Sequence, residues 1–273
     1  MTELRRRLLA GTLALALVAG ACGSGDDTDA VPAATAAPTA TTAVAPTAET
    51  DASPPAEDAT ADERATTTAE TADPEIVRFA TPDGEELEGT VYGTGATGVV
   101  LAHMRGRDRS TWTDFAKTAA AAGHQVLTFD FRGYGGSSGE RDTALDVDLI
   151  AAVELLRLRG VERTVIMGAS MGGTAVVNVA SRIDTAGAVS LSAPADFIGL
   201  PALAVAGDVA EPLLLVTAEG DQPYADAAVE MDGLAPVSQL TVLSGNAHGT
   251  NLFGDHGDAL TELLLSFIAD RSG

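Results

Sequence analysis

Eight short runs rich in aliphatic and β-branched residues alternate with helical stretches over residues 75–270, and this order limits the fold more than any other feature. The predicted strands are Glu75–Ala80, Glu86–Tyr92, Thr97–Ala102, His124–Asp130, Arg163–Met167, Ala186–Leu191, Pro212–Ala218 and Ser238–Leu243. Several are unbroken apolar runs, which is typical of strands that helices cover on both faces. The pattern therefore predicts an α/β fold with a mostly parallel, doubly wound sheet.

The helical stretches fall between these strands. The predicted helices are Ser110–Ala122, Thr143–Arg159, Met171–Arg182, Tyr224–Asp232 and His256–Asp270. In sheets of this kind ligands bind beyond the carboxyl ends of the strands. We therefore expect the functional side chains to come directly after strands.

The first 22 residues have the form of an export signal. Three arginines at residues 5–7 precede an apolar stretch, Leu8–Ala19, that is too short for an ordinary membrane span. Small residues then lead to Cys22, which resembles the lipobox of bacterial lipoproteins, although that family prefers Leu where Ala19 stands. The resemblance implies that Cys22 is lipidated and becomes the first residue of the mature protein. The alternative is an ordinary cleaved signal and a secreted protein.

Cys22 is also the only cysteine of the chain. The rest of the protein therefore has no disulfide, no thiol nucleophile and no cysteine metal site. A single cysteine at the end of an export signal favours attachment to lipid. We expect an exported protein, anchored to the outer face of the cell membrane.

Residues 23–73 consist almost wholly of Ala, Thr, Pro, Ser and acidic residues, without an aromatic residue or an apolar period. Such a segment buries too little apolar surface to offset the loss of chain entropy, so it predicts a disordered tether. Residues 74–273 are then expected to form one domain. The formal net charge of −23 argues against nucleic acid as a partner.

The segment 165–173 reads Val-Ile-Met-Gly-Ala-Ser-Met-Gly-Gly and contains the pattern Gly-x-Ser-x-Gly around Ser170. A strand precedes the serine and a helical stretch follows it, and a turn of this kind lifts the serine clear of the sheet as a nucleophile. The same pattern surrounds Ser137, but a loop separates that serine from its strand and charged residues follow it. The context favours Ser170 as the nucleophile and Ser137 as a loop residue.

An acid and a base follow later strands. Asp221 comes after the 212–218 strand, and His248 comes after the 238–243 strand. A serine hydroxyl is a weak nucleophile near neutral pH, so it needs a base, and the base needs a group that orients it. The alternatives are Glu219 and Asp196 for the acid, and His256, His124 and His103 for the base. We expect these histidines at a helix N-terminus, at a strand start and packed in a loop, respectively.

Four motifs make residues 75–270 resemble the α/β-hydrolase family. Val99–Gly106 is similar to the family's strand followed by His-Gly-x, and Asp130–Ser137 is similar to its Asp-x-Arg-Gly-x-Gly-x-Ser loop. The turn at Ser170 and the chain order Ser, Asp, His are the other two. The resemblance implies a serine hydrolase that passes through an acyl-enzyme, with Ser170 as nucleophile, His248 as base and Asp221 as the acid. We expect no cofactor, because no cluster of His, Asp or Glu has metal-ligand spacing and no glycine-rich loop suggests a dinucleotide site.

The resemblance also implies an oxyanion hole made by the backbone N–H groups of Met171 and Arg105. Met104 stands where the family has glycine, and its side chain is expected to narrow the pocket or shift the loop. We expect Asp130 to be structural, tying down its own loop, and Arg132 to pair with Asp130 or with another carboxylate.

Only about 20 residues, Ser192–Glu211, separate the sixth strand from the strand before Asp221. Many relatives carry a lid here, and a lid needs more chain, so we expect an open site. An open site favours carboxylic esters presented by bulky partners such as envelope glycolipid or acylated polysaccharide. Peptide, amide or thioester substrates are alternatives on the same triad. A further alternative is a non-catalytic, lipid-anchored binding module.

Overall fold

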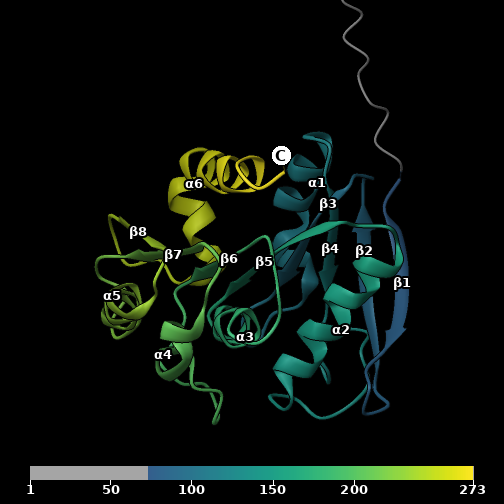
Figure 1. Ribbon diagram of the computed structural model, residues 1–273, viewed down its shortest axis with the longest axis horizontal. Coiled ribbons are helices and arrows are strands. Elements are labelled where there is room, and N and C mark those ends of the chain that lie inside the picture. The colour runs from purple at the N-terminus through teal and green to yellow at the C-terminus, as the bar shows by residue number, and fades with distance from the viewer. Residues whose placement is uncertain (1–72, 273) are drawn as a thin grey trace, which may run out of the picture. The chain divides into compact units, whose positions relative to one another are not determined.

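The computed structural model describes residues 73–272, which form a sheet with helices on both sides (Figure 1). The strands are β1 (Glu75–Ala80), β2 (Glu86–Tyr92), β3 (Thr97–Ala102), β4 (Gln125–Phe129), β5 (Arg163–Ala169), β6 (Gly187–Leu191), β7 (Leu213–Ala218) and β8 (Ser238–Leu243). The helices are α1 (Thr113–Ala121), α2 (Leu145–Leu158), α3 (Met171–Ala180), α4 (Ala202–Val205), α5 (Tyr224–Leu234) and α6 (Leu252–Ala269). Short 3-10 turns cover Arg109–Trp112, Ala206–Asp208 and Gly249–Asn251. The predicted signal, Cys22 and the tether lie outside the described residues.

The strands lie in the order β1-β2-β4-β3-β5-β6-β7-β8. Strand β2 pairs antiparallel with β1 and β4, and every other pair in the sheet is parallel. The predicted eight-stranded, mostly parallel sheet is confirmed. The loops after β3, β4, β5, β6, β7 and β8 consequently leave the sheet at the same edge.

Two apolar layers hold the helices to the sheet. Helices α2, α3 and α5 pack on one face, where the core includes Leu149, Val176 and Met231. Helices α1 and α6 pack on the other face, where it includes Phe115 and Leu260. Figure 1 shows the sheet between these two groups of helices. The doubly wound arrangement follows from strands that are apolar on both faces.

The observed elements differ from the predicted ones mainly at their ends. Strand β5 continues two residues beyond Met167, so it reaches the residue before Ser170. The predicted helix from Ser110 begins as a 3-10 turn, in which Asp108 accepts the Ser110 backbone N–H at 2.9 Å. The segment 192–211 holds only α4 and a 3-10 turn, which agrees with the expected absence of a large lid.

The helix predicted from His256 is the second part of α6, and the structure adds a first part that was not predicted. Helix α6 begins at Leu252, and His256, with φ −133°, lies at the kink between its two helical segments. The helix starts earlier because Leu252 is buried and Phe253 packs its ring against Trp112, with ring centroids 5.7 Å apart.

Candidate active site

Ser170 occupies the turn between β5 and α3. Its backbone has φ 50° and ψ −114°, a combination that non-glycine residues rarely adopt. The Ser170 backbone N–H donates to the Leu191 carbonyl on β6 at 2.7 Å, which ties the turn to the neighbouring strand. Strained residues of this kind persist only where the surrounding structure holds them, and they cluster at functional sites.

The glycines around Ser170 are required by close backbone contacts. A Cβ on Gly168 would lie 2.3 Å from the Gly172 carbonyl oxygen. A Cβ on Gly172 would lie 2.5 Å from the Ala102 carbonyl oxygen and 2.7 Å from that of His103. Helix α3 therefore starts directly against the end of β3, and only glycine fits the pattern's outer positions.

Asp221 and His248 are joined by hydrogen bonds. His248 Nδ1 lies 2.9 Å from Asp221 Oδ2 and 3.1 Å from Oδ1. An ionised carboxylate only accepts hydrogen bonds, so Nδ1 carries the proton and Nε2 is left to act as a base. Asp221 is buried, and the Tyr224 ring at the start of α5 lies 4.2 Å from the imidazole, centroid to centroid.

The loop of His248 also approaches the Ser170 turn. A Cβ on Gly249 would lie 3.4 Å from the Cβ of Ala169, so the residue after the histidine packs against the residue before the serine. In the described part of the chain, residues 73–272, the Ser170 hydroxyl makes no hydrogen bond to His248. Catalytic hydrogen bonds are often long in unliganded enzymes and tighten with substrate.

The two predicted oxyanion residues lie in different backbone settings. Met171 is the buried first residue of α3. Arg105 lies in an exposed turn, in which the Arg107 N–H donates to the Met104 carbonyl at 3.2 Å and Gly106 has φ 73°. A positive φ at the third position is what a type II turn requires.

Met104, which replaces the family's glycine, points toward the His248 loop. The Thr250 hydroxyl donates to Met104 Sδ at 3.2 Å, and a Cβ on Gly249 would lie 3.1 Å from that sulfur. The side chain thus fills space between the two loops. The resemblance alone gave no means of predicting this contact.

The alternative bases and acids have other surroundings. Buried His103 donates from Nδ1 to the Met104 carbonyl at 2.9 Å and accepts the Phe131 N–H at Nε2 at 3.1 Å, as expected of a histidine packed in its loop. Burial lowers the pKa of His103 and of His124. His256 donates to the Ser244 carbonyl at 2.9 Å. Glu219 is exposed, and Asp196 accepts the Gly199 N–H at 3.0 Å within a turn.

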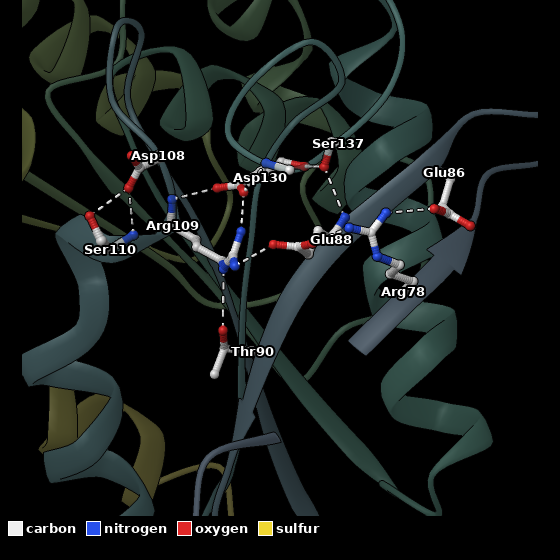
Figure 2. A network of polar contacts seen from close by, with 10 residues as sticks. Arg78, Glu86, Glu88, Thr90, Asp108, Arg109, Ser110, Asp130 and Ser137 are labelled. Carbon is white, nitrogen blue, oxygen red and sulfur yellow. Dashed lines mark hydrogen bonds and ion pairs between the residues drawn. The ribbon is translucent and has the colours of Figure 1, made fainter. Parts of the chain in front are cut away.

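Asp130 and Ser137 belong to a polar network beside the site (Figure 2). Asp130 accepts the Gly136 N–H at 3.0 Å and the Arg109 N–H at 2.8 Å, and it also pairs with the Arg109 guanidinium. The Ser137 hydroxyl donates to the Asp130 carbonyl at 2.7 Å and accepts the Glu88 N–H at 2.9 Å. Asp130 holds its own loop, as expected, and the Ser137 hydroxyl ties that loop to β2.

Arg132 pairs with carboxylates other than Asp130. It donates from its backbone N–H, Nε and Nη2 to the buried Asp148, at 2.9, 2.9 and 2.7 Å, and from Nη1 to Asp83 at 2.7 Å. Burial alone would lower the pKa of Arg132, but its contacts with Asp83 and Asp148 outweigh burial and raise this pKa. The hydrogen bond from Arg132 in turn lowers the pKa of Asp83. Arg109 and Tyr224 could not be predicted from the sequence, because neither belongs to a spaced motif.

The described part of the chain contains no group of three His, Cys, Asp or Glu residues that could hold a metal ion. Nor does any helix between residues 73 and 272 have the length and apolarity to cross a membrane.

A doubly wound sheet with a strained serine between a strand and a helix, and an Asp–His pair after later strands, defines a class of serine hydrolase scaffolds. The family model described as "Alpha/beta hydrolase family" matches residues 99–248, which is more than half of the chain. The chain therefore belongs to the alpha/beta hydrolase family.

Solved structures share this fold. An esterase from Pyrococcus furiosus is 19% identical with a TM-score of 0.64, covering 74% of this chain and 92% of that chain. An esterase from Exiguobacterium antarcticum is 15% identical with a TM-score of 0.62, covering 71% and 100%. A proline iminopeptidase from Mycobacterium smegmatis is 13% identical with a TM-score of 0.62, covering 72% and 99%. No curated protein matches the chain.

Proposed function

We propose that this protein is a serine hydrolase that cleaves carboxylic esters through an acyl-enzyme. The observation that carries the proposal is the 2.9 Å hydrogen bond from His248 Nδ1 to Asp221, in a fold that presents Ser170 on a strained turn. In the neutral imidazole this bond places the proton on Nδ1, so Nε2 is the nitrogen that can take the proton of the Ser170 hydroxyl.

We infer the steps of the reaction from the roles proposed for these groups. Ser170 Oγ attacks the ester carbonyl while His248 takes its proton, and Asp221 stabilises the resulting imidazolium. The backbone N–H groups of Met171 and Arg105 stabilise the negative charge on the carbonyl oxygen, each by about 3 kcal/mol in the transition state. His248 then protonates the leaving alcohol. A water molecule, activated by the same histidine, hydrolyses the acyl-enzyme.

Two features favour esters among the possible acyl substrates. Two of the structurally similar proteins are esterases, from Pyrococcus furiosus and Exiguobacterium antarcticum. The short segment between β6 and β7 leaves the site without a large lid, which suits bulky or polymeric esters. The iminopeptidase from Mycobacterium smegmatis keeps peptide hydrolysis as the second candidate, because the triad does not select the leaving group.

We further propose that the enzyme is exported and held on the outer face of the cell membrane by a lipid on Cys22. The support is the basic and apolar start of the chain and the position of its only cysteine. Replacing Cys22 with Ser should move the protein from the membrane fraction to the medium or the soluble fraction. A protein that stays in the membrane fraction after this change would contradict the anchor.

The catalytic proposal is tested with a fluorescent fluorophosphonate and a short-chain aryl ester. The wild type should be labelled and active, and Ser170→Ala should lose both properties. Turnover should fall by about 10⁴-fold or more, as in other triads. Ser137→Ala is the matched control, because Ser137 lies in the same Gly-x-Ser-x-Gly pattern but its hydroxyl is bonded to the Asp130 carbonyl and to the Glu88 N–H of β2.

The outcomes separate the candidates. Labelling that survives Ser170→Ala overturns the nucleophile, and labelling lost only with Ser137→Ala transfers the role to the other serine. Labelling at Ser170 without ester turnover, together with cleavage of an aminoacyl anilide, favours the peptidase. A folded wild type that is neither labelled nor active would indicate a binding module.

A further inference from the structure

Tyr134 and Asp142 connect the two segments that carry the predicted oxyanion donors. The Tyr134 hydroxyl donates to Asp142 Oδ1 at 2.5 Å and lies 3.9 Å from Met171 Sδ. The other carboxylate oxygen of Asp142 accepts Arg105 Nε at 2.9 Å and Nη2 at 2.8 Å. A continuous chain of contacts therefore runs from Arg105 through Asp142 and Tyr134 to Met171.

Tyr134 and Asp142, in the middle of this series of contacts, lie in the loop after β4. Tyr134 is 4% exposed, and the guanidinium of Arg141 lies 4.8 Å from its ring centroid. The Asp142 backbone is in the left-handed conformation, with φ 62°. Its carboxylate faces Tyr134 and Arg105. Burial and the adjacent Asp142 raise the pKa of the Tyr134 hydroxyl, so the hydroxyl keeps its proton and donates at neutral pH.

Arg105 and Met171, at the two ends of this series of contacts, need such a connection to different degrees. Met171 is fixed by the start of α3, whereas the Arg105 side chain is 62% exposed and its loop is a turn at the surface. An oxyanion hole requires both donors within about 2.7–3.1 Å of one oxygen atom. A shift of about 1 Å in one donor can reduce the rate about 100-fold. A surface turn needs an added constraint to hold such a distance.

We propose that Tyr134 and Asp142 are positioning residues that hold the Arg105 backbone N–H at a fixed distance from that of Met171. The proposal rests on the proposed hydrolase function. Asp142 holds Arg105 through paired hydrogen bonds to the guanidinium, and Tyr134 fixes the Asp142 carboxylate and contacts Met171. Neither residue contacts the reacting atoms. The loop after β4 thereby sets the geometry of the oxyanion hole through side chains.

The test compares Tyr134→Phe and Arg105→Met with the wild type, using Tyr92→Phe as the matched control. Tyr92 is buried on β2, so this control removes one hydroxyl from a buried ring away from Asp142. Turnover of an aryl ester is divided by the number of sites that react with the fluorophosphonate, which removes the effect of misfolded protein. Affinity for a trifluoromethyl ketone, which forms a tetrahedral adduct with the serine, is measured in parallel.

Each of the two variants should lower kcat by about tenfold to 100-fold while KM changes less than about twofold, because the donors act in the transition state. The affinity for the trifluoromethyl ketone should fall by the same factor. The double variant should lose little more than either single variant, since both break the same chain of contacts. Arg105→Lys, which keeps a donor to Asp142, should recover part of the rate.

The positioning role would be overturned if Tyr134→Phe or Arg105→Met had the same kcat and the same ketone affinity per reactive site as the wild type. Fully additive losses in the double variant would also overturn it. Arg105 is exposed, so its replacement keeps the test valid even if Tyr134→Phe folds poorly. A wild type that neither reacts with the fluorophosphonate nor hydrolyses esters would instead show that the proposed function itself is wrong.

Discussion

The turn at Ser170 and the loop after β4 lie at the same edge of the sheet, but different forces hold them in place. The Ser170 turn is held by backbone packing, in which glycines allow α3 to touch the ends of neighbouring strands. The loop after β4 is held by charged side chains, with Asp130 on Arg109 and Asp148 on Arg132. The first region has no space for an added atom, and in the second the buried carboxylates of Asp130 and Asp148 depend on their arginine partners.

This difference determines how each region fails. An added methyl group in the Ser170 turn must displace backbone, and overpacking of this kind costs about 1–3 kcal/mol. Removal of one partner from a buried ion pair leaves an uncompensated charge and costs about 3–5 kcal/mol. Substitutions in the loop should therefore reduce the free energy of unfolding more, and substitutions in the turn should reduce the activity more.

The largest expected effect on stability comes from Asp148→Ala. Asp148 is fully buried and accepts three hydrogen bonds from Arg132, which is itself 5% exposed. Its removal should lower the free energy of unfolding by about 3–5 kcal/mol, measured by urea denaturation. The matched control is Asp146→Ala on the same helix, where the pair with Arg182 is exposed and should be worth about 0–1 kcal/mol.

A loss below about 1 kcal/mol in Asp148→Ala would remove the distinction between the two regions. It would mean that water or Asp83, 2.7 Å from Arg132 Nη1, fully replaces the missing carboxylate.

The central strands of this fold could be predicted because they are local runs rich in apolar residues. The bounds of β1, β2, β3 and β8 agree with the predicted ranges. The start of α6 could not be predicted, because it depends on Leu252 and on Phe253 packing against Trp112, a residue far away in the sequence. Contacts of this kind leave no local periodicity.

The candidate site divides in the same way. The sequence placed Ser170, Asp221 and His248 after their strands, and the parallel sheet brings the ends of those strands to one edge. The contacts of Tyr134 with Asp142 and of Met104 with Thr250 depend on side-chain directions in loops, so spacing could not reveal them. Backbone order was predictable, and the side chains that hold the loops were not.

The next largest effect is expected for Gly172→Ala, which tests the packed turn directly. The new Cβ would lie 2.5 Å from the Ala102 carbonyl oxygen, and backbone on both sides would have to move. We expect a loss of about 1–3 kcal/mol in stability. Ester turnover should fall about 100-fold, because the N–H of Met171 moves with the start of α3. Stability and turnover both close to wild type would show that the turn is more adaptable than its contacts indicate.

A smaller, pH-dependent effect is expected from His103, which joins the two regions. Its Nε2 accepts the Phe131 N–H of the loop, and its carbonyl oxygen faces Gly172. Burial lowers the pKa of His103, although its hydrogen bond to Met104 and the charges of Asp130 and Asp108 oppose the shift. The folded state therefore binds fewer protons than the unfolded state as the pH falls below about 6.5, the ordinary pKa of histidine.

The sign of the pH effect follows from this difference. The free energy of unfolding should fall as the pH is lowered through about 6.5, by at most about 1.4 kcal/mol per pH unit for this group, and level off below its folded pKa. His124 contributes in the same direction, and Asp148, whose pKa is raised by burial, contributes in the opposite one. His103→Gln should flatten the slope between pH 7 and 5. An unchanged slope in urea denaturation would assign the dependence to other groups.

The smallest effect is expected for Gly254→Ala, and it completes the comparison with Gly172. Both glycines lie within helices, but a Cβ on Gly254 has no heavy atom within 4 Å, so the new methyl group meets open space. Alanine is favoured over glycine in a helix by about 0.5–1 kcal/mol, so the variant should gain that amount in thermal or urea unfolding. Because Gly254 is two residues from the kink at His256, a loss of stability would instead show that the kink needs a glycine. The same substitution should thus stabilise the exposed helix and destabilise the packed turn, because packing against backbone, and not helix propensity, decides its sign.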